Sequence, residues 1–160
     1  MSDENQLLTI LMVDDDPDDR LLFKEACEEV RLRNPLDFLE NGEQLVDYLK
    51  RRGNYADREG APFPGIILLD LNMPLKDGRE ALEEIKADAE LRHIPIIVLT
   101  TSKDEDDILS SYGLGASSYI VKPISLDRLM RVVNSIGEYW VQIVEVPTIE
   151  GQADNGDEDI

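Results

Sequence analysis

Residues 66–70 read Ile66-Ile67-Leu68-Leu69-Asp70, an unbroken apolar run that ends on a carboxylate. Three other apolar runs also end on polar residues: Ile10–Val13 on Asp14 and Asp15, Ile96–Leu99 on Thr100, and Tyr119–Val121 on Lys122. Short Val, Ile and Leu runs without polar alternation are typical of strands buried on both faces, as in a parallel sheet covered by helices. Because the carboxyl ends of such strands share one edge, we expect these polar residues to meet in one crevice.

Helical patterns with start signals lie between these runs. Asp16 and Pro17 are suited to an N-cap and a first helical position, and Asn41 with Gln44 has the spacing of a capping box. Further helices are expected after the loop 73–78, after Ser102 and after Ser125, and a short edge strand over Pro35–Leu39. This alternation predicts an α/β fold: a doubly wound, five-stranded parallel sheet in the order 2-1-3-4-5 with five helices.

Length and charge restrict the possible functions. The chain of 160 residues is long enough for one well-buried core, and its 35 Asp and Glu against 16 Lys and Arg give a net charge of −19. Nucleic-acid binding depends on Lys and Arg at phosphates, so this balance argues against nucleic acid. No apolar run approaches the ~18 residues of a membrane span, and residues 1–8 lack a signal-peptide pattern. We therefore expect a cytoplasmic protein without a membrane segment.

We expect one domain over residues 9–137, preceded by a polar tail over residues 1–8. Residues 138–147 form an apolar extension that would expose many apolar groups if unpaired, which favours an interface. Its candidate contact residues are Tyr139, Trp140, Ile143, Val144 and Val146. Residues 148–160 are polar and acidic and are expected to be disordered. Cys27 is the single cysteine, so no disulfide can form within the chain, and its place in a helical stripe predicts burial.

The expected crevice has the composition of a magnesium and phosphate site. Asp14, Asp15 and Asp70 would repel one another by roughly 1 to 4 kcal/mol per pair at ~4 Å, which a hard divalent cation such as Mg²⁺ would neutralise. With the metal bound, a carboxylate oxygen of Asp70 could attack the phosphorus of a phosphoryl donor. Lys122 would then hold one phosphoryl oxygen, and the Thr100 hydroxyl could donate a hydrogen bond to another.

These residues stand in motifs that together resemble the receiver domain of two-component response regulators. The motifs are Met-Val-Asp-Asp with Asp14 and Asp15, Leu-Asp-Leu-Asn-Met-Pro with Asp70, Val-Leu-Thr-Thr with Thr100, and Tyr-Ile-Val-Lys-Pro with Lys122. Their order and approximate spacing match the family over roughly residues 9–136. The resemblance implies the flavodoxin-like receiver fold.

The resemblance also implies a role for each site residue. Asp70 would be the phospho-acceptor. Asp15 and Asp70 would bind Mg²⁺ directly together with the backbone carbonyl of Asn72, while Asp14 would act mainly through water. Lys122 would be the phosphate counter-ion, with a cis peptide bond before Pro123. Thr100 and Tyr119 would form a switch pair, in which the hydroxyl moves toward the phosphoryl group and the aromatic ring follows inward; physically this is a population shift between two packings.

A narrower resemblance concerns the partners. Residues 51–64 and the tail around Tyr139-Trp140 resemble the single-domain regulators that accompany phytochrome-type sensor kinases, and those regulators are dimeric. The expected function is therefore a single-domain response regulator that takes a phosphoryl group from a sensor histidine kinase, such as a bacterial phytochrome, forms a homodimer and signals by protein contact. The expected chemistry is self-phosphotransfer and autodephosphorylation at Asp70, without turnover of a separate substrate.

Two alternatives remain open from the residues. The first is a receiver-like binding protein that acts without phosphorylation, although Asp70, Thr100 and Lys122 are all present. The second is a Mg²⁺-dependent phosphatase with an aspartyl nucleophile. Such an enzyme needs a second carboxylate two residues after the nucleophile, and this position is Asn72, which disfavours it.

Overall fold

The computed structural model describes residues 7–58, 60–101, 113 and 115–138. The elements follow one another as β1 (Ile10–Val13), α1 (Pro17–Glu29), β2 (Leu36–Leu39), α2 (Gly42–Lys50), the 3-10 segment η2 (Gly53–Arg58), β3 (Ile66–Asp70), α3 (Gly78–Ala87), β4 (Ile96–Thr100), β5 (Ser118–Val121) and α5 (Leu126–Ile136). The fifth helix, predicted after Ser102, lies outside the described residues. Within the described ranges, no helix combines the length and apolar character needed to cross a membrane.

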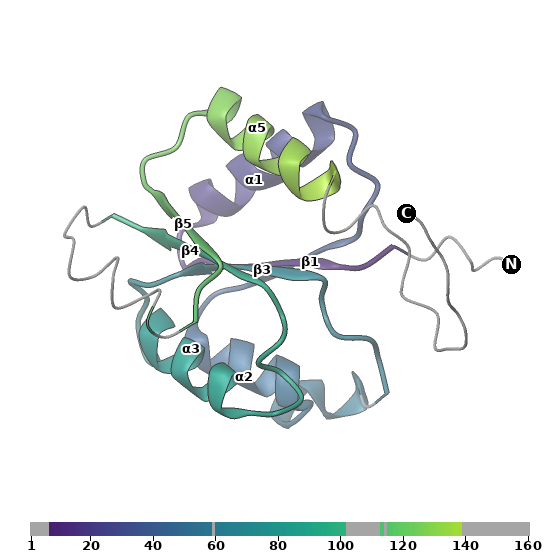
Figure 1. Cartoon of the computed structure of the whole chain (residues 1–160), viewed down its shortest axis with the longest axis vertical. Helices are drawn as coiled ribbons and strands as arrows, with labels where there is room; N and C mark the ends of the chain where they lie inside the picture. The colour runs from purple at the N-terminus through teal and green to yellow at the C-terminus, as the bar shows by residue number, and fades with distance from the viewer. Residues whose placement is uncertain (1–6, 59, 102–112, 114, 139–160) are drawn as a thin grey trace, which may run out of the picture.

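The five strands form one parallel sheet in the order β2-β1-β3-β4-β5, as predicted. Helices α1 and α5 cover one face, and α2 and α3 cover the other (Figure 1). From β1 the chain adds β2 on one side of the sheet and then β3, β4 and β5 on the other side. The direction in which strands are added therefore reverses between the adjacent strands β1 and β3. This is the switch point at which ligands of open α/β sheets bind.

Each central strand is buried on both faces, which explains the absence of polar alternation in its sequence. In β1, Leu11 and Val13 belong to the core under α2 and α3, whereas Ile10 and Met12 belong to the core under α1 and α5. All five residues of β3 are buried, Asp70 included. Cys27 is also buried, as predicted.

The helix starts predicted at Asp16, Asn41 and Ser125 are confirmed, with one difference at α2. The side chain of Asp16 caps α1 ahead of Pro17, and that of Ser125 caps α5. Asn41 caps α2 and accepts from the Gln44 amide N–H at 2.8 Å. The reciprocal contact of a capping box is shifted by one residue, because the Gln44 side chain accepts from the backbone of Glu40. The Glu40 N–H, which precedes the cap, is thereby satisfied by a side chain of the first turn of α2.

The Gly, Pro and charged residues of 53–64 follow no helical period and favour a loop, whereas the structure contains a 3-10 segment over Gly53–Arg58. Aromatic and cationic side chains hold this segment against α2. The ring of Tyr55 meets that of Tyr48 edge-on, with 5.4 Å between centroids, and the Arg58 guanidinium lies 4.5 Å from the Tyr48 ring centroid. Such contacts between side chains have no periodic sequence signal, so composition predicted only a loop.

Candidate functional site

The register of the sheet brings together the polar residues at the strand ends. Val13 is level with Leu69, so Asp14 and Asp70 are the next residues of adjacent parallel strands. Asp70 is in turn level with Leu99, and Leu99 with Ile120. Because side chains alternate between faces, Asp14, Asp70 and Lys122 all extend on the α1 and α5 side of the sheet. Four segments were predicted to meet here. Three of them do so through Asp14, Asp70 and Lys122, whereas the side chain of Thr100 extends to the opposite face of the sheet.

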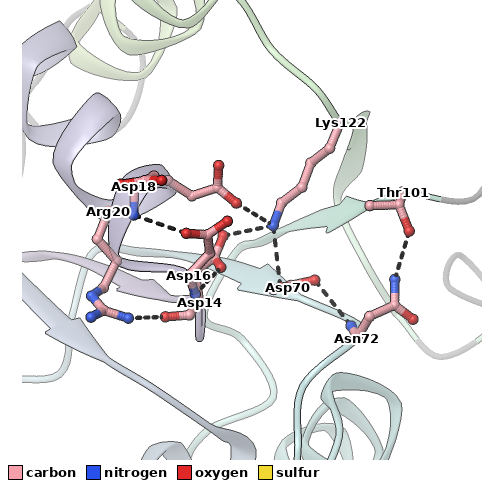
Figure 2. Close-up of polar contacts among 9 residues, drawn as sticks. Asp14, Asp16, Asp18, Arg20, Asp70, Asn72, Thr101 and Lys122 are labelled. Carbon is pink, nitrogen blue, oxygen red and sulfur yellow. Dashed lines mark hydrogen bonds and ion pairs between the residues drawn. The ribbon is translucent and has the colours of Figure 1, made fainter.

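Lys122 lies at the centre of this cluster (Figure 2). Its ammonium donates to Asp14 Oδ2 at 2.8 Å, to Asp19 Oδ2 at 2.7 Å and to Asp70 Oδ2 at 3.2 Å. The side chain of Lys122 is 12% exposed, and those of Asp14 and Asp70 are 0% and 4% exposed. An ammonium has three N–H donors, and here each of them faces a carboxylate.

Backbone contacts fix the two buried carboxylates. Asp14 Oδ1 accepts from the Asp16 N–H at 2.9 Å, and the Asp14 carbonyl accepts from the Arg20 guanidinium at 2.6 Å. Asp70 Oδ1 accepts from the Asn72 N–H at 3.0 Å. Each carboxylate therefore has one oxygen held by the backbone and the other directed at Lys122, as Figure 2 shows.

The cluster carries more negative than positive charge, and its side chains are largely shielded from water. Burial raises the pKa of Asp14 to about 6, although Lys122 and the Asp16 N–H lower it. Burial likewise raises the pKa of Asp70 against the lowering effects of the Asn72 N–H and Lys122. For Lys122, burial lowers the pKa, but the contacts with Asp14, Asp19 and Asp70 outweigh it and the pKa is raised. One cation is shared among several anions, so a further positive charge would be favourable.

The donor set fits such a cation. Carboxylate oxygens of Asp14, Asp15 and Asp70 lie within 4.8 Å of one another, and these are the three carboxylates predicted to bind Mg²⁺. Asp15 is exposed, whereas the other two are buried, so the cluster opens to solvent on one side. The open side is a cleft of about 620 Å³ lined in part by Asp15, Asp70, Asn72 and Lys122. Hard oxygen ligands beside a solvent-filled space suit Mg²⁺, which retains several of its waters.

Thr100 and Tyr119 lie beside the cluster on the opposite face of the sheet. Thr100 is buried and level with Val121, and its carbonyl accepts from the Lys122 N–H at 2.7 Å. Tyr119 is level with Val98 and packs against the core under α2 and α3. Parallel neighbours in register point to the same face, so both side chains share one side of the sheet. Their action as a switch pair stays a prediction.

Three further predictions have different outcomes. The peptide bond between Lys122 and Pro123 is cis, which confirms what the resemblance implied. The backbone carbonyl of Asn72 as a metal ligand and the water-mediated role of Asp14 stay predictions, although Asn72 lines the cleft. The proposed interface residues Tyr139, Trp140, Ile143, Val144 and Val146 lie outside the described residues.

Two residues of α1 that contact the cluster were missed from the sequence. Asp19 contacts Lys122, and Arg20 holds the carbonyl of Asp14. A signal was available, because a helix capped by Asp16 places residues 19 and 20 in its first turn, directly above the end of β1.

A comparison with known families agrees with this geometry. The family described as "Response regulator receiver domain" matches residues 10–134, which include every strand and helix of the structure except the last two residues of α5. The chain belongs to the response regulator receiver family. The receiver's cluster of Asp14, Asp15, Asp70 and Lys122 thus lies within the matched segment.

Individual relatives resemble this receiver over most of its length. It is 40% identical to response regulator Rcp1 of Synechocystis sp. over 148 residues, or 92% of this chain and 99% of Rcp1. The crystal structure of the Mn²⁺-bound form of Rcp1 has a TM-score of 0.74 and 39% identity, covering 88% of this chain and 99% of that one. The structure of the phosphorylated cyanobacterial phytochrome response regulator RcpA has a TM-score of 0.73 and 41% identity, covering 83% and 93%.

Proposed function

We propose that this receiver accepts a phosphoryl group on Asp70, with Mg²⁺ as cofactor, from a sensor histidine kinase. The observation that carries the proposal is the contact of Lys122 with the buried Asp70 beside two further carboxylates. A nucleophile, a counter-cation and a metal donor set thereby occupy one open cleft of the receiver fold. The Mn²⁺-bound structure of Rcp1 and the phosphorylated structure of RcpA support this assignment.

The proposed step is a displacement at phosphorus. An Asp70 carboxylate oxygen forms a new bond to phosphorus, while the bond from phosphorus to the donor nitrogen of the kinase histidine breaks. The bonding electrons leave with the imidazole, and an acyl phosphate forms on Asp70. The Asn72 N–H holds Oδ1 of Asp70. The other oxygen, Oδ2, contacts Lys122 and is the one directed at the cleft. Bound Mg²⁺ supplies the positive charge that shields the incoming phosphoryl oxygens from the carboxylates.

The lysine and the threonine have separate roles in this proposal. Lys122 donates to a phosphoryl oxygen by exchanging one of the carboxylate contacts of its ammonium. Thr100, at the end of the neighbouring strand, donates its hydroxyl to a second oxygen, and Tyr119 repacks on the same face of the sheet. The receiver then presents a changed surface to its target, a shift in population between two packings.

The proposed partners follow from the relatives and the C-terminal sequence. RcpA is a phytochrome response regulator, so its 41% identity supports a phytochrome-type sensor kinase as phosphoryl donor. Residues 138–147 are apolar in sequence, and we propose that they mediate a homodimer through Tyr139, Trp140, Ile143, Val144 and Val146. A histidine kinase draws on ATP, so we propose the cytoplasm as the location of the exchange.

Turnover of a separate substrate is disfavoured by Asn72. Its side-chain amide donates to Thr101 Oγ1 at 3.2 Å, so it presents a neutral amide where an aspartyl phosphatase needs a general acid. We propose self-phosphotransfer and autodephosphorylation at Asp70 as the full extent of the chemistry.

Intact mass after incubation with acetyl phosphate tests the function. The wild type is expected to gain one phosphoryl group with Mg²⁺ and none after chelation, and Asp70→Asn is expected to gain none under either condition. Asp57→Asn is a matched control, because Asp57 is an exposed aspartate in η2 and makes no contribution to the cleft lining. Mg²⁺ binding without any mass gain would favour the binding protein that acts without phosphorylation. Rapid consumption of acetyl phosphate would favour the phosphatase.

A further inference from the structure

Asp19 makes the shortest of the three contacts of Lys122. The distance from the ammonium to Asp19 Oδ2 is 2.7 Å, compared with 2.8 Å to Asp14 and 3.2 Å to Asp70. Asp19 belongs to the first turn of α1, where the helix dipole stabilises a negative charge. A carboxylate from a helix thus competes with the strand-end carboxylates for the same ammonium.

Asp19 differs from the other two partners of Lys122 in its relation to the metal. The carboxylates that can hold a cation together are Asp14, Asp15 and Asp70 among the described residues, and Asp19 is outside that group. A cation at this cluster would attract Asp14 and Asp70 and weaken their hold on the ammonium. Asp19 would then be the remaining partner of Lys122 before a phosphoryl group arrives.

The partial exposure of Asp19 allows it to release the Lys122 ammonium. Its side chain is 33% exposed, whereas that of Asp14 is fully buried. Water can replace the lost ammonium contact at Asp19, whereas loss of that contact at the buried Asp14 would leave a charge unpaired and out of reach of water. Asp19 also lines the cleft beside Asp70 and Pro123, so it lies next to the path by which a phosphoryl group enters.

We propose that Asp19 restrains Lys122: it holds the ammonium in the unphosphorylated protein, competes with the incoming phosphoryl oxygens and so slows phosphorylation of Asp70. Asp19 is a positioning residue, because it acts through Lys122. The inference rests on the proposed function of Asp70 as phospho-acceptor. It adds a residue of α1, Asp19, that lowers the rate of that reaction.

The test is the rate of phosphorylation by acetyl phosphate at saturating Mg²⁺, followed by intact mass. Asp19→Asn keeps the size of the side chain and removes its charge. The expected rate increase is roughly two- to fivefold, the range for one partly exposed ion pair. Asp19→Glu keeps the charge and is expected to stay close to the wild-type rate. Asp18→Asn is the matched control, because Asp18 is the adjacent aspartate of the same first turn and its side chain is exposed.

Two further readouts separate restraint from structural damage. The rate advantage of Asp19→Asn is expected to shrink as ionic strength rises, since the competing interaction is between charges near solvent. Its Mg²⁺ affinity is expected to match that of Asp18→Asn, because Asp19 is outside the metal cluster. Damage to the fold would instead lower the rate and weaken Mg²⁺ binding together.

The outcomes distinguish the inference from the function on which it rests. A faster Asp19→Asn with a normal Asp18→Asn supports the restraint. If the wild type is phosphorylated but Asp19→Asn is equal to it or slower, the restraint is wrong and the function stands. If Asp18→Asn accelerates as much as Asp19→Asn, the effect is one of overall charge and the restraint is again wrong. Absence of phosphorylation in the wild type would overturn both.

Discussion

Gly78 packs directly against the backbone of Asp70. An ideal Cβ at Gly78 would lie 2.3 Å from the Asp70 carbonyl oxygen and 2.7 Å from the Cα of Leu71. The Gly78 N–H also donates to the Leu71 carbonyl at 3.1 Å. The start of α3 therefore packs tightly against the end of β3. The backbone immediately after the proposed phospho-acceptor has little room to move as a result.

Gly78→Ala is therefore expected to destabilise the protein and disturb the site together. The added methyl group meets backbone atoms that cannot rotate away, and overpacking of this kind costs about 1 to 3 kcal/mol of unfolding free energy. Urea unfolding would measure this cost. Gly113→Ala is a suitable control, because a Cβ there would meet nothing within 4 Å. Equal stability of the two variants would show that the β3–α3 connection can adjust.

The parts of this structure that could be predicted are those with a local or periodic cause. The runs ending at Asp14 and Asp70 predicted central strands because burial on both faces removes polar alternation. Asp16 and Ser125 predicted helix starts because a capping side chain acts within three residues. Once the strand order was inferred, the meeting of Lys122 with Asp14 and Asp70 followed from parallel geometry.

The features that were missed depend on how elements pack. Asp19 and Lys122 are 103 residues apart, and their contact depends on the position of α1 over the sheet. The 3-10 segment depends on Tyr48, Tyr55 and Arg58 meeting across a loop. The capped start of α1 places Asp19 near the end of β1 but does not specify Lys122 as its partner. The contacts of the 3-10 segment leave no spacing in the sequence, since its side chains could equally have been solvated.

Tyr48 connects this 3-10 segment to the edge of the sheet. Its hydroxyl donates to Asp37 Oδ2 at 2.7 Å and accepts from Arg58 Nη2 at 3.0 Å. Tyr48→Phe removes both hydrogen bonds and leaves the ring contacts, so a loss of about 1 to 2 kcal/mol is expected in unfolding free energy. Tyr55→Phe, which keeps the ring packed on Tyr48, is expected to stay within about 0.5 kcal/mol of wild type. A reversed order of the two variants would contradict the structural role of the Tyr48 hydroxyl.

Cys27 is expected to be inert in the folded protein. It is 3% exposed, and burial, with a smaller contribution from the charge of Glu28, raises its pKa from 9.0 to about 12. At pH 8 this shift lowers the thiolate fraction by roughly a thousandfold. Iodoacetamide is therefore expected to label Cys27 slowly in buffer and rapidly in concentrated urea, as measured by intact mass. Rapid labelling without urea would indicate that α1 opens readily from the sheet.

The charge of Asp14 is expected to make stability depend on pH in a direction opposite to that of an ordinary ion-paired carboxylate. Burial raises its pKa to about 6, above the ordinary value of 3.8 that applies to the unfolded chain. Between these two values the folded protein binds the proton more tightly than the unfolded chain does. The contribution of Asp14 to stability is therefore fully present below pH 4 and is lost as the pH rises through about 6.

The variant Asp14→Asn isolates this contribution, because it carries no charge at any pH. In the absence of Mg²⁺, the unfolding free energy of Asp14→Asn relative to wild type is expected to increase as the pH is raised from 5 to 7, measured by urea titration at fixed ionic strength. Saturating Mg²⁺ is expected to reverse the order at pH 7, since the cation stabilises the wild-type carboxylate and binds Asp14→Asn more weakly. A difference that stayed constant over this pH range would mean that Lys122 keeps Asp14 ionised despite its burial.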